Sequence, residues 1–214
     1  MNIQLYQKLY NDFIEGIDGI DNGVNEYPAD VKSNYKVMTD LGARVGWLNP
    51  AWNETGVDLD ARFSQAMAMT GVDFTQFVQY NAKAWLPARE VVEEAIKKRF
   101  EVHPSGEVIV LSTFCPWKSH LSDLEEEQHI TGVIKYAVFQ DSSASWRVQC
   151  MSVSPDSFDN RKSLPEPWWG KRDADLSNIS GIPGCIFIHA TGFIGGAQTK
   201  DSALKLAFAG LEAK

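Results

Sequence analysis

The sequence predicts an α+β fold, in which a helical half precedes a mixed α/β domain with a small sheet. Apolar residues recur three or four positions apart through most of residues 1–99, which is the spacing of amphipathic helices. Short stretches rich in β-branched and aromatic residues, bounded by turn residues, begin only after residue 100. We therefore expect a helical segment over residues 1–99 and an α+β domain over residues 100–214.

The helical half contains four predicted helices. They cover residues 2–17, 35–48, 59–85 and 88–100. Asn49-Pro50 ends the second helix, because the residue before a proline disfavours helical dihedral angles. Pro87 suits the first turn of the fourth helix, where its missing N–H leaves no hydrogen bond unmade. The basic residues at positions 97–99 then complement the negative end of the helix dipole.

An acidic segment with several glycines follows the first helix. Each glycine weakens an ordinary surface helix by about 1 kcal/mol, so another requirement must favour glycine there. Asp18 and Asp21 lie three positions apart and point to one side if the helix continues that far. Two carboxylates with small neighbours suit a divalent metal ion. The alternative is that Asn22-Gly23 is a helix terminus with acidic residues nearby.

The second half contains three predicted strands before its last segment. They cover residues 107–111, 133–139 and 146–153, and residues 141–145 read as the hairpin loop between the last two. A segment rich in proline and tryptophan, residues 161–173, precedes a short helix near residues 175–180. The last segment closes the sheet and ends in a helix.

The composition is that of a globular protein with unevenly distributed charge. The 214 residues carry a net charge of −8 and are 44% hydrophobic, and no apolar run approaches the roughly 18 residues that a membrane span needs. We expect no secretory signal, and the three separated cysteines suit buried thiols in a reducing compartment. Residues 1–60 are acidic and residues 161–214 are basic. The acidic segment suits a metal ion and the basic segment suits a phosphate. The alternative is that both are ordinary solvated surfaces.

The stretch over residues 180–211 is the strongest candidate for a ligand site. An apolar run over residues 185–188 ends at His189, and a glycine-rich loop from Gly192 to Gly196 follows. Gly195 and Gly196 lack Cβ atoms, so the backbone can adopt positive φ and a ligand can approach its N–H groups. The sequence therefore predicts a strand, a polar residue and a bare-backbone loop in succession.

A helix after this loop favours an anion at its start. Thr199 or Asp201 can cap it, and its free N–H groups attract negative charge such as a phosphate. The alternative is a tight strand-to-helix connection without a ligand, with His189 as a hydrogen-bonded structural residue. No GxSxG, HExxH or P-loop motif occurs, and the four histidines lack metal-ligand spacing.

Cationic residues lie beside aromatic ones at three places in the second half. Lys118 follows Trp117, Arg147 follows Trp146, and Arg161 opens the segment rich in proline and tryptophan. Such mixtures bind single-stranded nucleic acid, because bases stack on the rings and phosphates meet the charges. The alternative is that each tryptophan packs under aliphatic stems in an ordinary surface turn.

Seven blocks in order resemble a known family. They read FIEGIDGIDNGV, LGARVGWLNPAWN, WLPAREVVEEAIKKRFEV, CPWKSHL, WRVQCMSVSPDSF, RKSLPEPWWGKRD and GIPGCIFIHATGFIGGAQTKDSAL. From Leu5 onward the chain resembles the C-terminal part of the Myg family, the melanocyte-proliferating-gene type exonucleases. These are also labelled metal-dependent protein hydrolases and are related to the DHH phosphoesterases.

The resemblance implies a two-lobed hydrolase, with a DHH lobe that holds divalent metal and a C-terminal lobe that binds substrate. The main metal-ligand signatures precede the start of this chain, so residues 1–99 correspond to the tail of the DHH lobe and a linker. Only Asp21, or its neighbour Asp18, matches a metal-binding motif. The resemblance places the following residues at the substrate face and none in catalysis: His189, Gly192, Gly195, Gly196, Lys118, Arg147 and Arg161.

The resemblance also implies partners and an activity. We expect 3′–5′ exonuclease chemistry with manganese or magnesium in the full-length protein, no tightly bound metal in this chain, and little hydrolysis by it alone. Expected partners are single-stranded nucleic acid, with RNA favoured, the missing N-terminal DHH lobe, and a second copy through apolar surface exposed at residues 1–25. The compartment implied is the cytoplasm in bacteria, or the nucleus and mitochondrion in eukaryotes. A noncatalytic nucleotide- or RNA-binding module and a protein-interaction domain are the alternatives.

Overall fold

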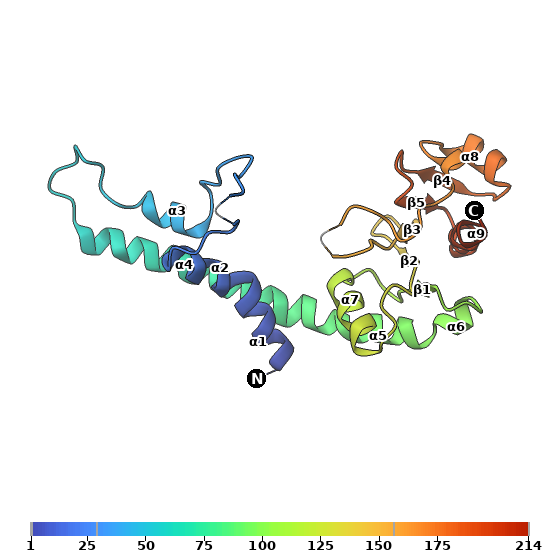
Figure 1. Cartoon of the computed structure of the whole chain (residues 1–214), viewed down its shortest axis with the longest axis horizontal. Helices are drawn as coiled ribbons and strands as arrows, with labels where there is room; N and C mark the ends of the chain where they lie inside the picture. Colours follow the sequence, from blue (N-terminus) through green and yellow to red (C-terminus); the bar gives the residue numbers. More distant parts are fainter. Residues whose placement is uncertain (1, 29, 156, 214) are drawn as a thin grey trace. The chain divides into compact units, whose positions relative to one another are not determined.

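The computed structural model describes residues 2–28, 30–155 and 157–213. The chain forms two compact units, Met1–Leu86 and Pro87–Lys214. The first is helical and the second holds a five-stranded mixed sheet with helices, so the predicted α+β fold is confirmed (Figure 1).

The first unit begins with one helical run in three parts. These are α1 (Ile3–Leu9), the π-helical turn η1 (Tyr10–Ile14) and α2 (Glu15–Asp21). The Asn2 side chain caps the run by accepting from the N–H of Gln4 at 2.9 Å. The helix therefore continues through the acidic segment and ends at Asn22, where Gly23 adopts a φ of 71°.

Three further elements complete the first unit. They are α3 (Leu41–Gly46), α4 (Leu59–Tyr80) and η2 (Asn81–Trp85). The ring of Phe13 packs against Phe74 and Phe77, each with a centroid distance of 5.4 Å. The predicted helix over residues 35–48 is too long, because Asp40 accepts from the N–H of Ala43 at 2.7 Å and begins the helix there.

The second unit alternates helices and strands. Its elements are α5 (Leu86–Lys97, whose first residue lies in the first unit), α6 (Arg99–Val102), β1 (Val108–Val110), α7 (Lys118–Glu127), β2 (Tyr136–Gln140), β3 (Trp146–Cys150), η3 (Glu166–Trp168), α8 (Asp173–Ser180), β4 (Cys185–Ile188), β5 (Ile194–Ala197) and α9 (Lys200–Glu212). The strand order is β1-β2-β3-β5-β4, with β1 and β2 parallel and the other pairs antiparallel. The predicted hairpin between β2 and β3 is confirmed by its register.

Both faces of this sheet are covered. Because strand side chains alternate, Val108, Tyr136 and Val138 point into a core shared with α8 and α9, whereas Ile109 and Ala137 point into a core shared with α5 and α7. The unit boundary at residue 86 precedes the predicted boundary at residue 99, because α5 buries its apolar face against the sheet. Helical periodicity does not show which core a helix joins.

The glycine-rich stretch differs most from its prediction. Instead of a loop that leads into a helix, residues 194–197 form β5, a strand between β3 and β4. The turn is confined to residues 189–193, where the N–H of Gly192 donates to the carbonyl of His189 at 2.9 Å. Glycine is common in loops, but in a packed sheet it also makes room for neighbouring side chains.

Candidate functional site

A cavity of about 760 Å³ lies within the second unit. It forms between the start of α7, the end of β3, the segment after β3 and the turn between β4 and β5. Aromatic rings, hydroxyl groups, amides and two cations line it. These are Trp117, Phe158 and Phe193; Ser119, Ser122, Ser152, Ser154, Ser157 and Thr191; Gln149 and Asn160; and Lys118 and Arg161.

The first turn of α7 borders the cavity. Trp117 occupies the N-cap position and carries no side-chain acceptor with which to cap the helix. Lys118 follows, exposed, with its Nζ 6.0 Å from the Trp117 ring centroid. The positive end of the helix dipole and a lysine therefore meet at one wall of the cavity, an arrangement that favours an anion.

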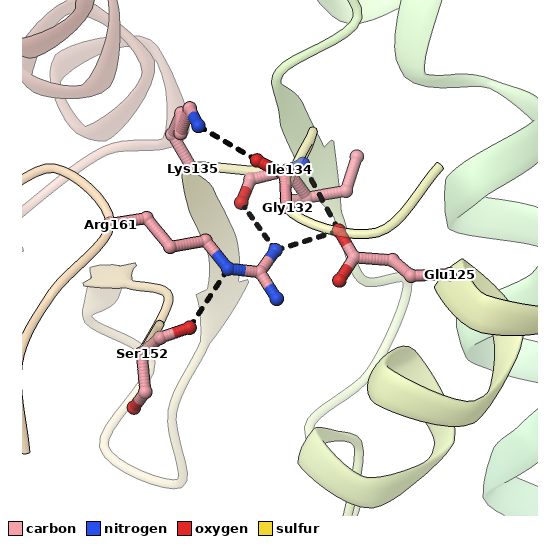
Figure 2. A network of polar contacts seen from close by, with 6 residues as sticks. All are labelled: Glu125, Gly132, Ile134, Lys135, Ser152 and Arg161. Atoms are coloured by element: carbon pink, nitrogen blue, oxygen red, sulfur yellow. Dashed lines mark hydrogen bonds and ion pairs between the residues drawn. The ribbon is translucent and has the colours of Figure 1, made fainter. Parts of the chain in front are cut away.

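Arg161 is held at the cavity wall by buried contacts (Figure 2). Its Nη1 donates to Glu125 Oε1 at 2.7 Å and to the Ile134 carbonyl at 3.0 Å, and its Nε donates to the Ser152 carbonyl at 2.8 Å. The side chains of Arg161 and Glu125 are 9% and 1% exposed. Predicted only as a substrate contact, Arg161 is also the centre of an internal network that joins α7 to the segment after β3.

Arg147 lies on β3 but does not border the cavity. It pairs with Asp141 at 2.5 Å, and its guanidinium lies 5.1 Å from the Phe187 ring centroid. Hydrogen bonds from Ser143, with smaller contributions from Ser145 and Arg147, hold the pKa of Asp141 below its usual range. Gln149, two residues along the strand and on the same sheet face, does line the cavity.

Gly195 and Gly196 are packed rather than open to a ligand. A Cβ at Gly196 would collide with the Arg147 guanidinium and lie 2.7 Å from the Phe187 ring, and one at Gly195 would collide with Ile188. The prediction of bare, accessible backbone at these two glycines is therefore wrong. The missing Cβ atoms make room for side chains of the protein itself.

The turn before β5 does reach the cavity. Its Thr191 and Phe193 line the wall, while Gly192 is buried with a φ of 68° against the Trp169 indole. His189 is exposed, and its Nδ1 accepts from the N–H of Thr191 at 3.2 Å. His189 thus supports the shape of the turn, and its predicted role in substrate binding stays a prediction.

Asp18 and Asp21 are exposed on α2 in the first unit. Asp18 Oδ1 accepts from the Asn22 side chain at 3.1 Å. Among the described residues, no group of three or more histidine, cysteine or acidic side chains could hold a metal ion. Two carboxylates alone do not make a complete site, so we derive no chemistry through a metal held by these residues.

Comparison with known proteins identifies the family. A family model labelled MYG1 exonuclease, and described as an uncharacterised protein family (UPF0160), matches residues 2–211. The chain belongs to this MYG1 family. It is 48% identical to the MYG1 protein of Dictyostelium discoideum over 205 residues, which cover 95% of the chain and 62% of the relative. It is 46% identical to the MYG1 exonuclease of Rattus norvegicus and 45% identical to that of Homo sapiens, over 97% of the chain in both comparisons.

The chain covers only part of the length of its MYG1 relatives. The chain spans 62% of the Dictyostelium relative and 54% of the rat relative. No solved structure matches the chain. In the described part of the chain, no helix is long and apolar enough to cross a membrane.

The sequence alone does not mark several of the cavity residues. Gln149, Asn160, Thr191 and the serines carry no spacing that marks a site, because they come from four separate segments. The one available signal is the concentration of serines in SVSPDS after β3. Lys118 and Arg161 were the predicted residues that the fold brings to this cavity.

Proposed function

We propose that Pro87–Lys214 is the substrate-binding part of a metal-dependent phosphoesterase related to the DHH family, and that its cavity receives the end of a single-stranded nucleic acid, with RNA favoured. The observation that supports this most is the composition of the cavity. Aromatic rings, hydroxyl groups and cations border a volume of about 760 Å³, within the range of small-molecule sites in proteins. Several relatives bear the name exonuclease.

The geometry suggests how a nucleotide end would be held. A phosphate at the start of α7 would meet the helix dipole and Lys118, while serine hydroxyls donate to its remaining oxygens. The fully exposed ring of Phe158 and the ring of Phe193 offer stacking surfaces for bases. Arg161 also lies at the wall, where the ion pair with Glu125 neutralises its charge, so Lys118 is the lining residue that would offset the phosphate charge.

We further propose that hydrolysis belongs to the portion of the family's chain outside these 214 residues. That portion would bind the divalent metal, manganese or magnesium, which supplies the attacking hydroxide and clamps the phosphate. In the described residues, Asp18 and Asp21 offer two carboxylates and no further ligand. The role of this chain is then to bind and orient the substrate.

Fluorescence anisotropy with a short 5′-labelled single-stranded RNA tests the cavity. We expect Lys118→Ala to weaken binding and to reduce the slope of log affinity against log salt by about 0.7, the value for one lost phosphate contact. Phe158→Ala should cost about 1–3 kcal/mol of binding through lost stacking. Lys205→Ala is the matched control, because Lys205 lies on α9, away from the cavity, and pairs with Asp201 at 2.7 Å.

Two outcomes would contradict the proposal. If Lys118→Ala and Phe158→Ala bind RNA as tightly as the unmodified chain, the cavity is not the site. If the chain alone cleaves RNA with manganese, and Asp21→Ala abolishes the cleavage, hydrolysis does not require another portion. RNA binding without cleavage, even when the rest of a MYG1 protein is supplied, would favour a noncatalytic RNA-binding module.

A further inference from the structure

The first unit, Met1–Leu86, has almost no hydrophobic core of its own. Among the described residues of this unit, only Asn81 and Trp85 are buried, whereas the second unit buries 28 hydrophobic side chains. Twenty of the 25 exposed large hydrophobic side chains in the described chain belong to the first unit. Exposed apolar surface on this scale marks an interaction site.

Nine of these exposed side chains form two rows at helical spacing. The first row runs along α1, η1 and α2 and consists of Ile3, Tyr6, Tyr10, Ile14, Ile17 and Ile20. The second runs along α4 and includes Leu59, Phe63 and Met67. A stripe with this spacing normally faces a core, yet these side chains face outward.

The helix that carries the first row also has bare backbone. Cβ atoms added at Gly16 and Gly19 would find nothing within 4 Å. Both glycines lie inside a helix, where each costs about 1 kcal/mol relative to alanine, and no contact in the described chain explains them. Close approach by the backbone of a partner would explain why glycine occupies these positions.

We propose that these two rows form a docking surface for the portion of the MYG1 chain that this sequence lacks. The relatives supply the length: 38% of the Dictyostelium protein lies outside the matched region, since the match covers 62%. This inference stands on the first unit and on the length of the relatives, independently of the nucleotide cavity. The partner face is apolar, with basic residues at its edge to complement an acidic unit.

A second copy of the chain fits this surface less well. Residues 1–86 contain 11 acidic and six basic residues, so pairing two such units brings like charges together. The described residues of the second unit expose few large hydrophobic side chains, and these belong to separate segments: Phe100, Phe114, Val153, Phe158 and Ile179.

The experiment co-expresses the full 214-residue chain with the segment of the Dictyostelium relative that lies outside the match. We expect a one-to-one complex by light scattering, and slower hydrogen exchange in α1, α2 and α4 than in the chain alone. Binding of the dye ANS to the chain should fall on complex formation. The variant with both Phe63→Glu and Met67→Glu should bind the segment at least about tenfold more weakly, because it places two charges in an apolar interface.

The matched control carries Gln65→Glu and Ala68→Glu, which add the same charge to exposed positions of α4 away from the row. It should bind normally. Three results of the binding experiments would overturn the proposal: no complex with the unmodified chain, equal binding by the Phe63/Met67 variant, or a homodimer of the chain that this variant abolishes. Strong amide protection of α1, α2 and α4 without ANS binding in the chain alone would show that the rows are covered within the chain, and would also overturn the proposal.

RNA anisotropy on the same samples reports on the cavity separately, so either proposal can fail without the other.

Discussion

At the scale of single residues, the same residue type serves different ends in this chain. Gly195 and Gly196 were predicted to expose backbone to a ligand, and the structure buries both inside β5. Lys118 and Arg161 were predicted beside aromatic residues and do border the cavity, one exposed and one nearly buried. Three predictions belong to this scale.

Gly196→Ala separates packing from ligand access. The added Cβ would meet the Arg147 guanidinium and the Phe187 ring, so we expect the free energy of unfolding to fall by about 1–3 kcal/mol. Urea denaturation measures this. If stability is unchanged and only RNA binding is lost, Gly196 serves the ligand after all.

Arg161→Ala should be among the most destabilising single substitutions in the second unit. It leaves the Glu125 carboxylate, 1% exposed, without its ion-pair partner, which costs about 3–5 kcal/mol. Chemical denaturation followed by circular dichroism tests this, with Lys205→Ala as an exposed ion-pair control expected to lose no more than about 1 kcal/mol. Similar losses in both variants would show that the Arg161 network contributes little.

Cys150 should make the chain less stable in alkali. Burial raises the pKa of this thiol from 9.0 to about 12, so between these values the unfolded chain loses a proton that the folded chain keeps. Rising pH then favours unfolding, by up to about 1.4 kcal/mol per pH unit from this one group. We expect the stability difference between the unmodified chain and Cys150→Ala to shrink from pH 9 to pH 11. A constant difference would show that the thiol is not protected.

At the scale of elements, local signals predicted helices better than strands. The helices of the first unit and α9 follow from periodicity and capping residues, and β1, β2 and β3 were located within a few residues. Helix α7 was not predicted, because its first turn was read as a cation-aromatic cluster. Strand β5 was not predicted either, since a strand with two glycines forms only where neighbours fill their space.

The cap of α9 gives a prediction at this scale. The structure resolves the choice between Thr199 and Asp201, because Thr199 Oγ1 accepts from the N–H of Ser202 at 3.1 Å. Thr199→Ala should lower the free energy of unfolding by about 1 kcal/mol, and Thr199→Ser should restore most of it. Thermal unfolding of the pair measures this, and equal stability of the two variants would mean that the cap contributes nothing.

At the scale of the whole molecule, the two units differ in how far they bury their large apolar side chains. Pro87–Lys214 covers both sheet faces with helices and holds a cavity, whereas Met1–Leu86 turns most of its large apolar side chains outward. The prediction of apolar surface at residues 1–25 was therefore too narrow, because the rows extend along α4 to Met67. A sequence shows that a helix is amphipathic, but not whether its apolar face finds a partner within the chain.

The sequence by itself determined the α+β class, most helices, the β2–β3 hairpin and the MYG1 family, because periodicity, caps, turn residues and ordered motifs are local properties of the chain. Only the tertiary structure decided that Gly195 and Gly196 are packing positions, that Arg161 pairs with Glu125, and that four separate segments share one cavity. The physical reason is that burial and side-chain contact depend on which distant segments meet. The spacing of residues along one segment does not show which distant segments it contacts.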